Sequence, residues 1–280
     1  MRSSKFITAD IEKTEKITTF TLDMRYFAEL RYDGSAYCGW QRQTEAPSVQ
    51  QTIEKGLSTL LRENIEITGA GRTDTGVNAA YYVAHFDAAA PIENCGQLVY
   101  KLNLILPQDI SILSISAVAD EAHARFDAVQ REYRYRIEQT KNPFTRGGSW
   151  QYYVPLNVGE MNRAAECLLQ YDDFTSFAKL NSNNKTNICH IERAGWWREG
   201  DTLWFSIRAD RFLRNMVRAI TGTLVDVGRG RYTAEDFERI VASRDLSLAS
   251  GGAPAQGLFL WDVVYPATLF ERKTLINNNV

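Results

Sequence analysis

The sequence predicts an α+β protein whose sheets are antiparallel. The chain has 280 residues, of which 44% are hydrophobic, so it can form the core of one large domain or of two smaller ones. Segments typical of strands and of helices occur in both halves, but they do not alternate strictly as in a doubly wound parallel sheet. Residues 131–139, REYRYRIEQ, alternate between apolar and charged positions, which indicates a strand with one buried face.

We expect two α/β halves of similar size, although no internal sequence repeat is detectable. The N-terminal half covers residues 25–128 and the C-terminal half covers 129–266. Residues 1–24 are expected to be an N-terminal extension and residues 267–280 a C-terminal tail. The extension is polar and mixed in charge, which argues against a signal peptide, and no apolar run in the chain approaches the length that spans a membrane.

The N-terminal half begins with a strand over residues 24–34 that ends in an Asp-Gly turn. A loop rich in aromatic and amide groups follows. Ser48 is then the expected N-cap of a helix over 48–64, with Gln51 completing a capping box. Its apolar face consists of Val49, Ile53, Leu57, Leu60 and Leu61. The remaining expected elements are a strand, glycine turn and strand over 66–88, and a strand over 110–119.

The C-terminal half repeats this mixture of elements. In the strand over 131–139, Tyr133, Tyr135 and Ile137 share one face, whereas Arg134, Arg136 and Glu138 share the other. The other expected strands are 202–210 and 257–265. The expected helices are 158–170, 211–228, and 233–244 after a Thr233 cap.

Composition narrows the class of protein. The formal net charge is −2, so an anionic partner must be met by a local basic cluster. The cysteines lie far apart without a CxxC pair, which argues against a zinc site or a disulfide framework and favours reduced thiols in a cytoplasmic protein. They are Cys38, Cys95, Cys167 and Cys189. The histidines (His85, His123 and His190) lack metal-ligand spacing, so we expect no metal, and no G-x-S-x-G elbow is present.

Residues 69–76, GAGRTDTG, allow several interpretations. Gly71 and Gly76 have the spacing of a Walker loop, but Val77 stands where that loop needs lysine. Gly69 and Gly71 begin a dinucleotide fingerprint, but Asp74 puts a negative charge where the pyrophosphate would lie. A hairpin turn in which Asp74 caps local N–H groups is the alternative without a ligand. The spacing alone leaves this turn and a functional Asp74 both open.

A local basic cluster follows in the C-terminal half. Six arginines and two aspartates fall within residues 208–231. Arg211, Arg214 and Arg218 share one face of the predicted helix 211–228, which is either a solvated face or an anion-binding surface.

The segment 123–137, HARFDAVQREYRYRI, carries arginines interleaved with tyrosines. Such a strand suits RNA, because tyrosine rings stack on unpaired bases and arginines bind phosphates. The same pattern also fits a strand with an aromatic core face and a charged outer face.

Seven segments together resemble the TruA-type tRNA pseudouridine synthases, in order from residue 32 to residue 260. Each alone is weak evidence, but seven in the right order are specific. The segments are YDGSAYCGWQRQ (32–43), SVQQTIEKGL (48–57), GRTDTGVNA (71–79), HARFDAVQREYRYRI (123–137), DFTSF (173–177), FLRNMVRAITGTLVDVG (212–228) and AQGLFL (255–260).

The resemblance implies roles for particular residues. Asp74 matches the catalytic aspartate, and Arg72 matches an arginine that contacts RNA and helps to extrude the target base. Tyr133 matches the tyrosine that packs against that base, and Arg218 the basic residue paired with the aspartate. Leu258 and Leu260 match apolar residues that wall the pocket. Arg211 and Arg214 are expected, from the helix pattern, to bind RNA as well.

The resemblance also implies a fold and an activity. It implies two ferredoxin-like, RRM-like α/β halves joined into a pseudouridine synthase fold with a basic cleft between them. The expected enzyme is a cofactor-free, homodimeric isomerase acting on uridines 38, 39 and 40 in the anticodon stem-loop of tRNA. A carboxylate at Asp74 suits this chemistry as nucleophile or as partner of a cationic sugar. Thr75 and Asn78 depart from the commonest family pattern, GRTDAGVHA.

Two alternatives from other classes remain open. One is a non-catalytic tRNA-binding protein or RNA chaperone on the same scaffold. The other is a nucleotide-phosphate enzyme that uses the glycine-rich loop.

Overall fold

The structure, a computed structural model, describes residues 24–179 and 185–269. The expected N-terminal extension, apart from Met24, and the tail from residue 270 lie outside the described residues. The strands are β1 (Met24–Tyr32), β2 (Ile67–Gly69), β3 (Asn78–Ala88), β4 (Ile110–Ala117), β5 (Gln130–Glu138), β6 (Trp150–Gln151), β7 (Ile191–Glu199), β8 (Thr202–Ala209) and β9 (Leu258–Val264). The α-helices are α1 (Val49–Leu61), α2 (Cys95–Ile105), α3 (Val158–Glu166), α4 (Met216–Gly228) and α5 (Ala234–Ser243).

The strands form one mixed sheet in the order β4-β1-β3-β9-β5-β8-β7, with β2 added to β3 and β6 to β5. Most neighbours are antiparallel, which confirms a mixed α/β fold with mainly antiparallel pairing. The ladders β3–β9 and β5–β6 are parallel and short. Because Asn78 pairs with Phe259 and Ala79 with Leu260, β9, the last strand of the described residues, joins the N-terminal strands to the C-terminal ones.

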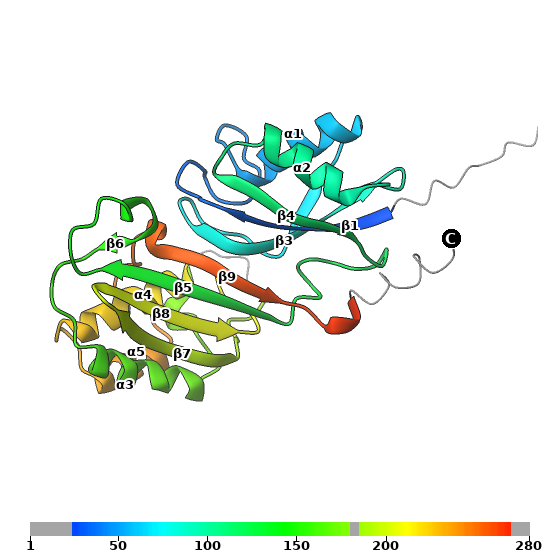
Figure 1. The fold of residues 1–280 in the computed structure, drawn as a ribbon. Helices are drawn as coiled ribbons and strands as arrows, with labels where there is room; N and C mark the ends of the chain where they lie inside the picture. Colours follow the sequence, from blue (N-terminus) through cyan, green and yellow to red (C-terminus); the bar gives the residue numbers. More distant parts are fainter. Residues whose placement is uncertain (1–23, 180–184, 270–280) are drawn as a thin grey trace, which may run out of the picture.

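Two groups of helices cover the two ends of this sheet (Figure 1). Helices α1 and α2 lie by the N-terminal strands, where α1 packs against β2 and α2 against β4. Helix α3 packs against β7, and α4 and α5 pack against α3. Each group encloses its own apolar core. Helix α1 shows why: Ser48 Oγ accepts a hydrogen bond from Gln51 N at 3.2 Å, and Val49, Ile53 and Leu57 are buried, as the apolar spacing predicts.

The predicted helix 211–228 is wrong in its first turn, because α4 begins only at Met216. Asn215 has a φ of 65°, in the left-handed region, which an α-helix excludes. Just before it, Asp210 Oδ1 accepts hydrogen bonds from Arg211 N at 2.7 Å and from His190 N at 2.8 Å. The Asp210 carboxylate therefore satisfies backbone N–H groups in a non-helical conformation, as aspartate commonly does in turns.

Candidate active site

Asp74 lies in the loop between β2 and β3, and the backbone of that loop is held from both sides. At its start, Ala70 N donates to Val83 O at 2.8 Å. Further along, Trp40 N donates to Thr73 O at 3.3 Å, and Gly76 N donates to Tyr37 O at 3.2 Å. The loop before α1, which contains Tyr37 and Trp40, therefore holds the Asp74 loop through backbone hydrogen bonds.

Buried aromatic rings fix the residues beside Asp74. The Tyr32 and Thr73 hydroxyls are 2.8 Å apart, and the Tyr82 hydroxyl donates to Gly71 O. The rings of Trp40 and Tyr82 stack with their centroids 4.1 Å apart. The backbone of Gly39 also packs closely against Thr73. A Cβ atom on Gly39, whose φ is +88°, would lie 2.3 Å from Thr73 O. Asp74 is thus carried by a rigid loop, as a preorganised catalytic group requires.

The carboxylate of Asp74 faces two guanidinium groups from the other half of the chain. Arg214 Nε lies 3.5 Å from Asp74 Oδ1, and Arg218 Nη1 lies 3.9 Å from Asp74 Oδ2. The Asp74 side chain is 26% exposed, Arg218 is 23% exposed and Arg214 is 61% exposed. Within the described ranges, Asp74 accepts no backbone hydrogen bond through its side chain, so it does not cap its own turn.

Arg218 is held in place by the segment 249–257, which we call the strap. Arg218 Nε donates to Ala253 O at 2.7 Å, and Ala253 N donates to Arg218 O at 2.9 Å. The strap also reaches the Asp74 loop, because the buried Asn78 side chain donates to Gln256 O at 2.9 Å. Asn78 Oδ1 in turn accepts from Gly34 N at 2.8 Å. Asn78 therefore links three segments around the site, a role that its position in the sequence does not reveal.

Tyr133 is half-buried on β5 near Asp74. Its ring meets Phe212 edge-on, with the centroids 5.2 Å apart. Burial raises the pKa of Tyr133 to about 12, and the negative charge of Asp74 acts in the same direction. The phenol therefore stays protonated at neutral pH.

The two leucines expected near the pocket are core residues. Leu258 is 5% exposed and Leu260 is 2% exposed. Leu260 is the cross-strand neighbour of Tyr133, and Leu258 that of Tyr135. Leu260 therefore packs beside Tyr133, and little of either leucine is accessible to a ligand.

The six arginines of residues 208–231 do not gather in one place. Only Arg214 and Arg218 face Asp74. Arg208 pairs with Glu132 at 2.7 Å on the sheet, and Arg211 Nη1 donates to Thr186 O at 3.4 Å. The remaining two, Arg229 and Arg231, both face Asp226.

The other arginines expected to bind RNA lie in two different settings. Arg72 is exposed on the Asp74 loop and makes no ion pair with any described residue. Arg134 packs over the Trp261 ring at 4.2 Å and pairs with Glu132 at 2.8 Å, while Tyr135 is fully buried. For Tyr135 and Ile137, the interpretation as a core face holds, but the charged face is not solvated throughout, because Glu132 and Glu138 are buried.

Nothing in the described part of the chain forms a group of three or more His, Cys, Asp or Glu side chains able to hold a metal ion. No helix within the same residues is long and apolar enough to cross a membrane.

Comparison with known proteins gives a consistent result. The sequence profile of a family described as tRNA pseudouridine synthase matches residues 28–127 and 164–266, which include Asp74 and both of its arginines. A tRNA pseudouridine synthase A of Bacteroides thetaiotaomicron is 49% identical over 253 residues, covering 89% of this chain and 94% of the relative. Proteins of the same name from Listeria welshimeri and Shigella boydii are each 39% identical, over 86% and 85% of this chain and 99% and 88% of their own length.

Proposed function

The chain belongs to the tRNA pseudouridine synthase family, and from that premise we propose that it isomerises uridine to pseudouridine in tRNA, with Asp74 as the catalytic group. One observation supports this role above all others: a carboxylate on a rigid loop of one half faces two guanidinium groups from the other half. Neither arginine can lose its proton, so two fixed positive charges lie beside the carboxylate.

The proposed reaction breaks the N1–C1′ bond of uridine, turns the uracil, and forms a bond from C5 to C1′. The C5 proton is lost and N1 gains a proton, so atoms balance without an oxidant or a reductant. Ionised Asp74 acts as the nucleophile or stabilises a cationic sugar. The target base must leave its stack to reach the carboxylate.

The neighbouring residues have matching proposed roles. Tyr133 offers a protonated phenol and a ring against which uracil can pack. Exposed Arg72 holds the nucleotide out of its stack, and Leu258 and Leu260 support the wall of the base pocket from within. Arg214 both binds RNA phosphate and serves Asp74 as a second cation, whereas Arg211 binds RNA further along.

We also propose the finer features implied by the resemblance. The halves 25–128 and 129–266 are ferredoxin-like units, and a basic cleft between them accepts the anticodon stem-loop with uridines 38, 39 and 40 as targets. The enzyme works as a cytoplasmic homodimer without a cofactor. The meeting of Asp74 with Arg214 and Arg218 across the two halves supports the placement of the cleft.

The test uses purified protein and unmodified tRNA labelled with tritium at C5 of uridine. Wild-type protein should release tritium and form pseudouridine. Asp74→Asn should lower the rate more than about a thousandfold while changing tRNA affinity less than about twofold. Asp120→Asn, a change at an exposed aspartate of the N-terminal half, is the control and should leave the rate unchanged. Tight tRNA binding by wild-type protein without any pseudouridine would instead favour a non-catalytic RNA-binding protein.

A further inference from the structure

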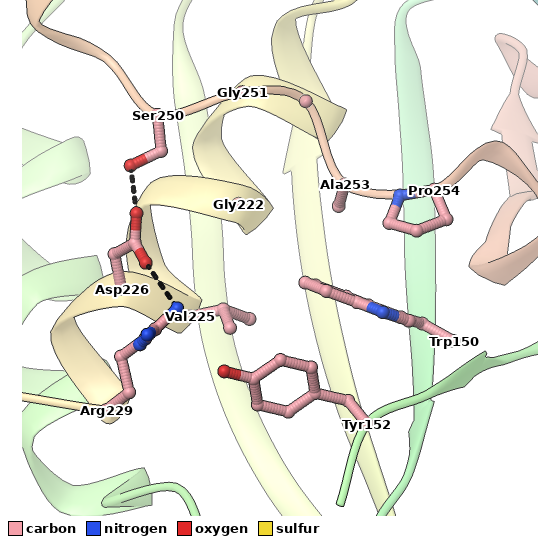
Figure 2. A pocket seen from close by; sticks show the side chains of 11 residues that line it. Trp150, Tyr152, Gly222, Val225, Asp226, Arg229, Ser250, Gly251, Ala253 and Pro254 are labelled. Carbon is pink, nitrogen blue, oxygen red and sulfur yellow. Dashed lines mark hydrogen bonds and ion pairs between the residues drawn. The ribbon is translucent and has the colours of Figure 1, made fainter. Parts of the chain in front are cut away.

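A pocket of about 240 Å³ lies between α4, the strap and the Trp150 and Tyr152 rings (Figure 2). The Trp150 and Tyr152 rings project into it from β6 and the residue after it. Asp226 and Arg229 form the opposite wall, and the strap runs along its rim. The lining is completed by Gly222, Val225, Ser250, Gly251, Gly252, Ala253 and Pro254.

The size of this pocket suits one planar ring system. Pockets for drug-sized ligands range from roughly 300 to 1,000 Å³, so this one is smaller. A cavity of about 150 Å³ is enough to hold benzene, so this one is larger than a single six-membered ring requires. A nucleobase lies between these limits.

The walls combine a stacking surface with a polar edge. The Trp150 and Tyr152 centroids are 4.8 Å apart with their planes tilted by 60°, so either ring presents a face or an edge to the space. On the opposite wall, Asp226 Oδ2 accepts from Ser250 Oγ at 2.5 Å and lies 3.5 Å from Arg231. Asp226 Oδ1 faces Arg229 at 3.6 Å, beyond ordinary hydrogen-bond distance, and so can accept an N–H group from a ligand.

The pocket and the proposed catalytic site share two structural elements, α4 and the strap. Arg218, which faces Asp74, and Asp226 lie on the same helix, and eight residues of α-helix span about 12 Å. The strap that binds Arg218 through Ala253 also forms the rim of the pocket. Arg229 lines the pocket and is 48% exposed, and Arg231, which pairs with Asp226, is 60% exposed, so both can provide positive charge for a phosphate.

We propose that this pocket binds a second, non-target base of the RNA whose uridine is held at Asp74. This inference rests on the proposed function. The base stacks on the Trp150 and Tyr152 rings, one of its N–H groups donates to Asp226, and its phosphate meets Arg229. Adenine, cytosine and guanine make this contact with an amino group and uracil with its N3–H, so the pocket accepts each of the four bases and stacking supplies most of the affinity.

The experiment combines single abasic substitutions in the unpaired nucleotides of an anticodon stem-loop RNA with two protein variants. Tyr152→Ala and Arg229→Ala should each raise KM and Kd for the intact RNA by about 5- to 100-fold, as loss of one base–aromatic contact does, with kcat changed less than about twofold. One abasic position other than the target should weaken binding to wild-type protein by a similar factor. That abasic RNA should lose almost nothing further on Tyr152→Ala, because the same contact is already absent.

Matched controls separate this site from general loss of charge or fold. Tyr153→Ala changes the adjacent, exposed tyrosine, and Arg239→Ala changes an arginine that, like Arg229, pairs with an aspartate three residues earlier. Both should bind like wild type. If wild-type protein makes pseudouridine but Tyr152→Ala and Arg229→Ala match the controls, the pocket proposal is wrong. It is also wrong if adenosine 5′-monophosphate binds in a Tyr152-dependent way while no abasic position matters. If wild-type protein makes no pseudouridine, the proposed function fails instead.

Discussion

Replacing Arg218 by glutamine should slow catalysis much more than the same change at Arg214. Glutamine removes the charge that faces Asp74 but keeps an N–H group that can still donate to Ala253 O. The variant therefore tests the electrostatic role of Arg218 with the strap still bound. Arg214→Gln is the matched change at the second cation.

The structure sets the expected size of each effect. Opposite unit charges about 4 Å apart interact by about 1 kcal/mol in water and by about 4 kcal/mol at an effective dielectric constant near 20. Arg218 and Asp74 are 3.9 Å apart and both mostly shielded from solvent, so we expect a loss of about 2–3 kcal/mol, or roughly 30- to 150-fold in kcat. Arg214 is 61% exposed, so screening limits its contribution to about 1 kcal/mol, or roughly fivefold.

Tritium release from C5-labelled tRNA at saturating concentration measures kcat for both variants and for the double variant, so that a lost phosphate contact of Arg214 does not enter the comparison. The double variant should lose more than the product of the single effects, because each arginine partly replaces the other. An Arg214→Gln defect equal to or larger than that of Arg218→Gln would refute this electrostatic reasoning. So would two variants with wild-type rates.

Three further changes test the supports of the site and the core behind it. Asn78→Ala should lower the free energy of unfolding, measured in urea, by about 2–4 kcal/mol, because it leaves two backbone groups without their partner. Gly39→Ala should destabilise by about 1–3 kcal/mol and also lower kcat, because the new Cβ strains a left-handed backbone and displaces Thr73 beside Asp74. Burial lowers the pKa of His85 to about 4. Between about pH 6.5 and pH 4, His85 is therefore protonated in the unfolded chain and neutral in the folded chain. Stability should therefore fall by up to about 3 kcal/mol as the pH drops through that window, and His85→Gln should flatten the dependence.

Two controls accompany these three changes. Thr75→Ala, at an exposed position of the Asp74 loop, should match wild-type stability and rate. His190→Gln removes an exposed histidine whose pKa is raised by Asp172, so it should not flatten the acid-side loss of stability. Unaltered urea midpoints for Asn78→Ala, full activity for Gly39→Ala, or an unchanged pH profile for His85→Gln would each contradict the corresponding argument.

Local patterns in the sequence predicted individual elements well. The apolar spacing after Ser48 identified α1, and Thr233 with Asp236 forms the capping box that begins α5. Helix α2 was not predicted, because Tyr100, Leu104 and Ile105 are exposed and obscure its amphipathic pattern. Strand β7 was not predicted either: Gly195 and the adjacent Trp196 and Trp197 interrupt its alternation.

Long-range placement could not be read from the sequence. The position of β9 between β3 and β5 depends on contacts between residues about 180 apart, such as Asn78 with Phe259. The arginines of residues 208–231 are close in sequence, yet they lie in different parts of the structure. The helix does not include the residues before Asn215, and Asp210 and Asp226 bind nearby backbone and arginine groups. The family motifs singled out Asp74 and Arg218, whereas the second cation at Arg214 and the bridging role of Asn78 became visible only in three dimensions.

The most direct measurement maps pseudouridine in tRNA from cells that lack this protein and are complemented with wild-type protein or with Asp74→Asn at equal abundance. Our account predicts that pseudouridine at positions 38, 39 and 40 disappears without the protein, returns with the wild type, and stays absent with Asp74→Asn. Full modification restored by Asp74→Asn would contradict the claim that this one carboxylate carries the reaction.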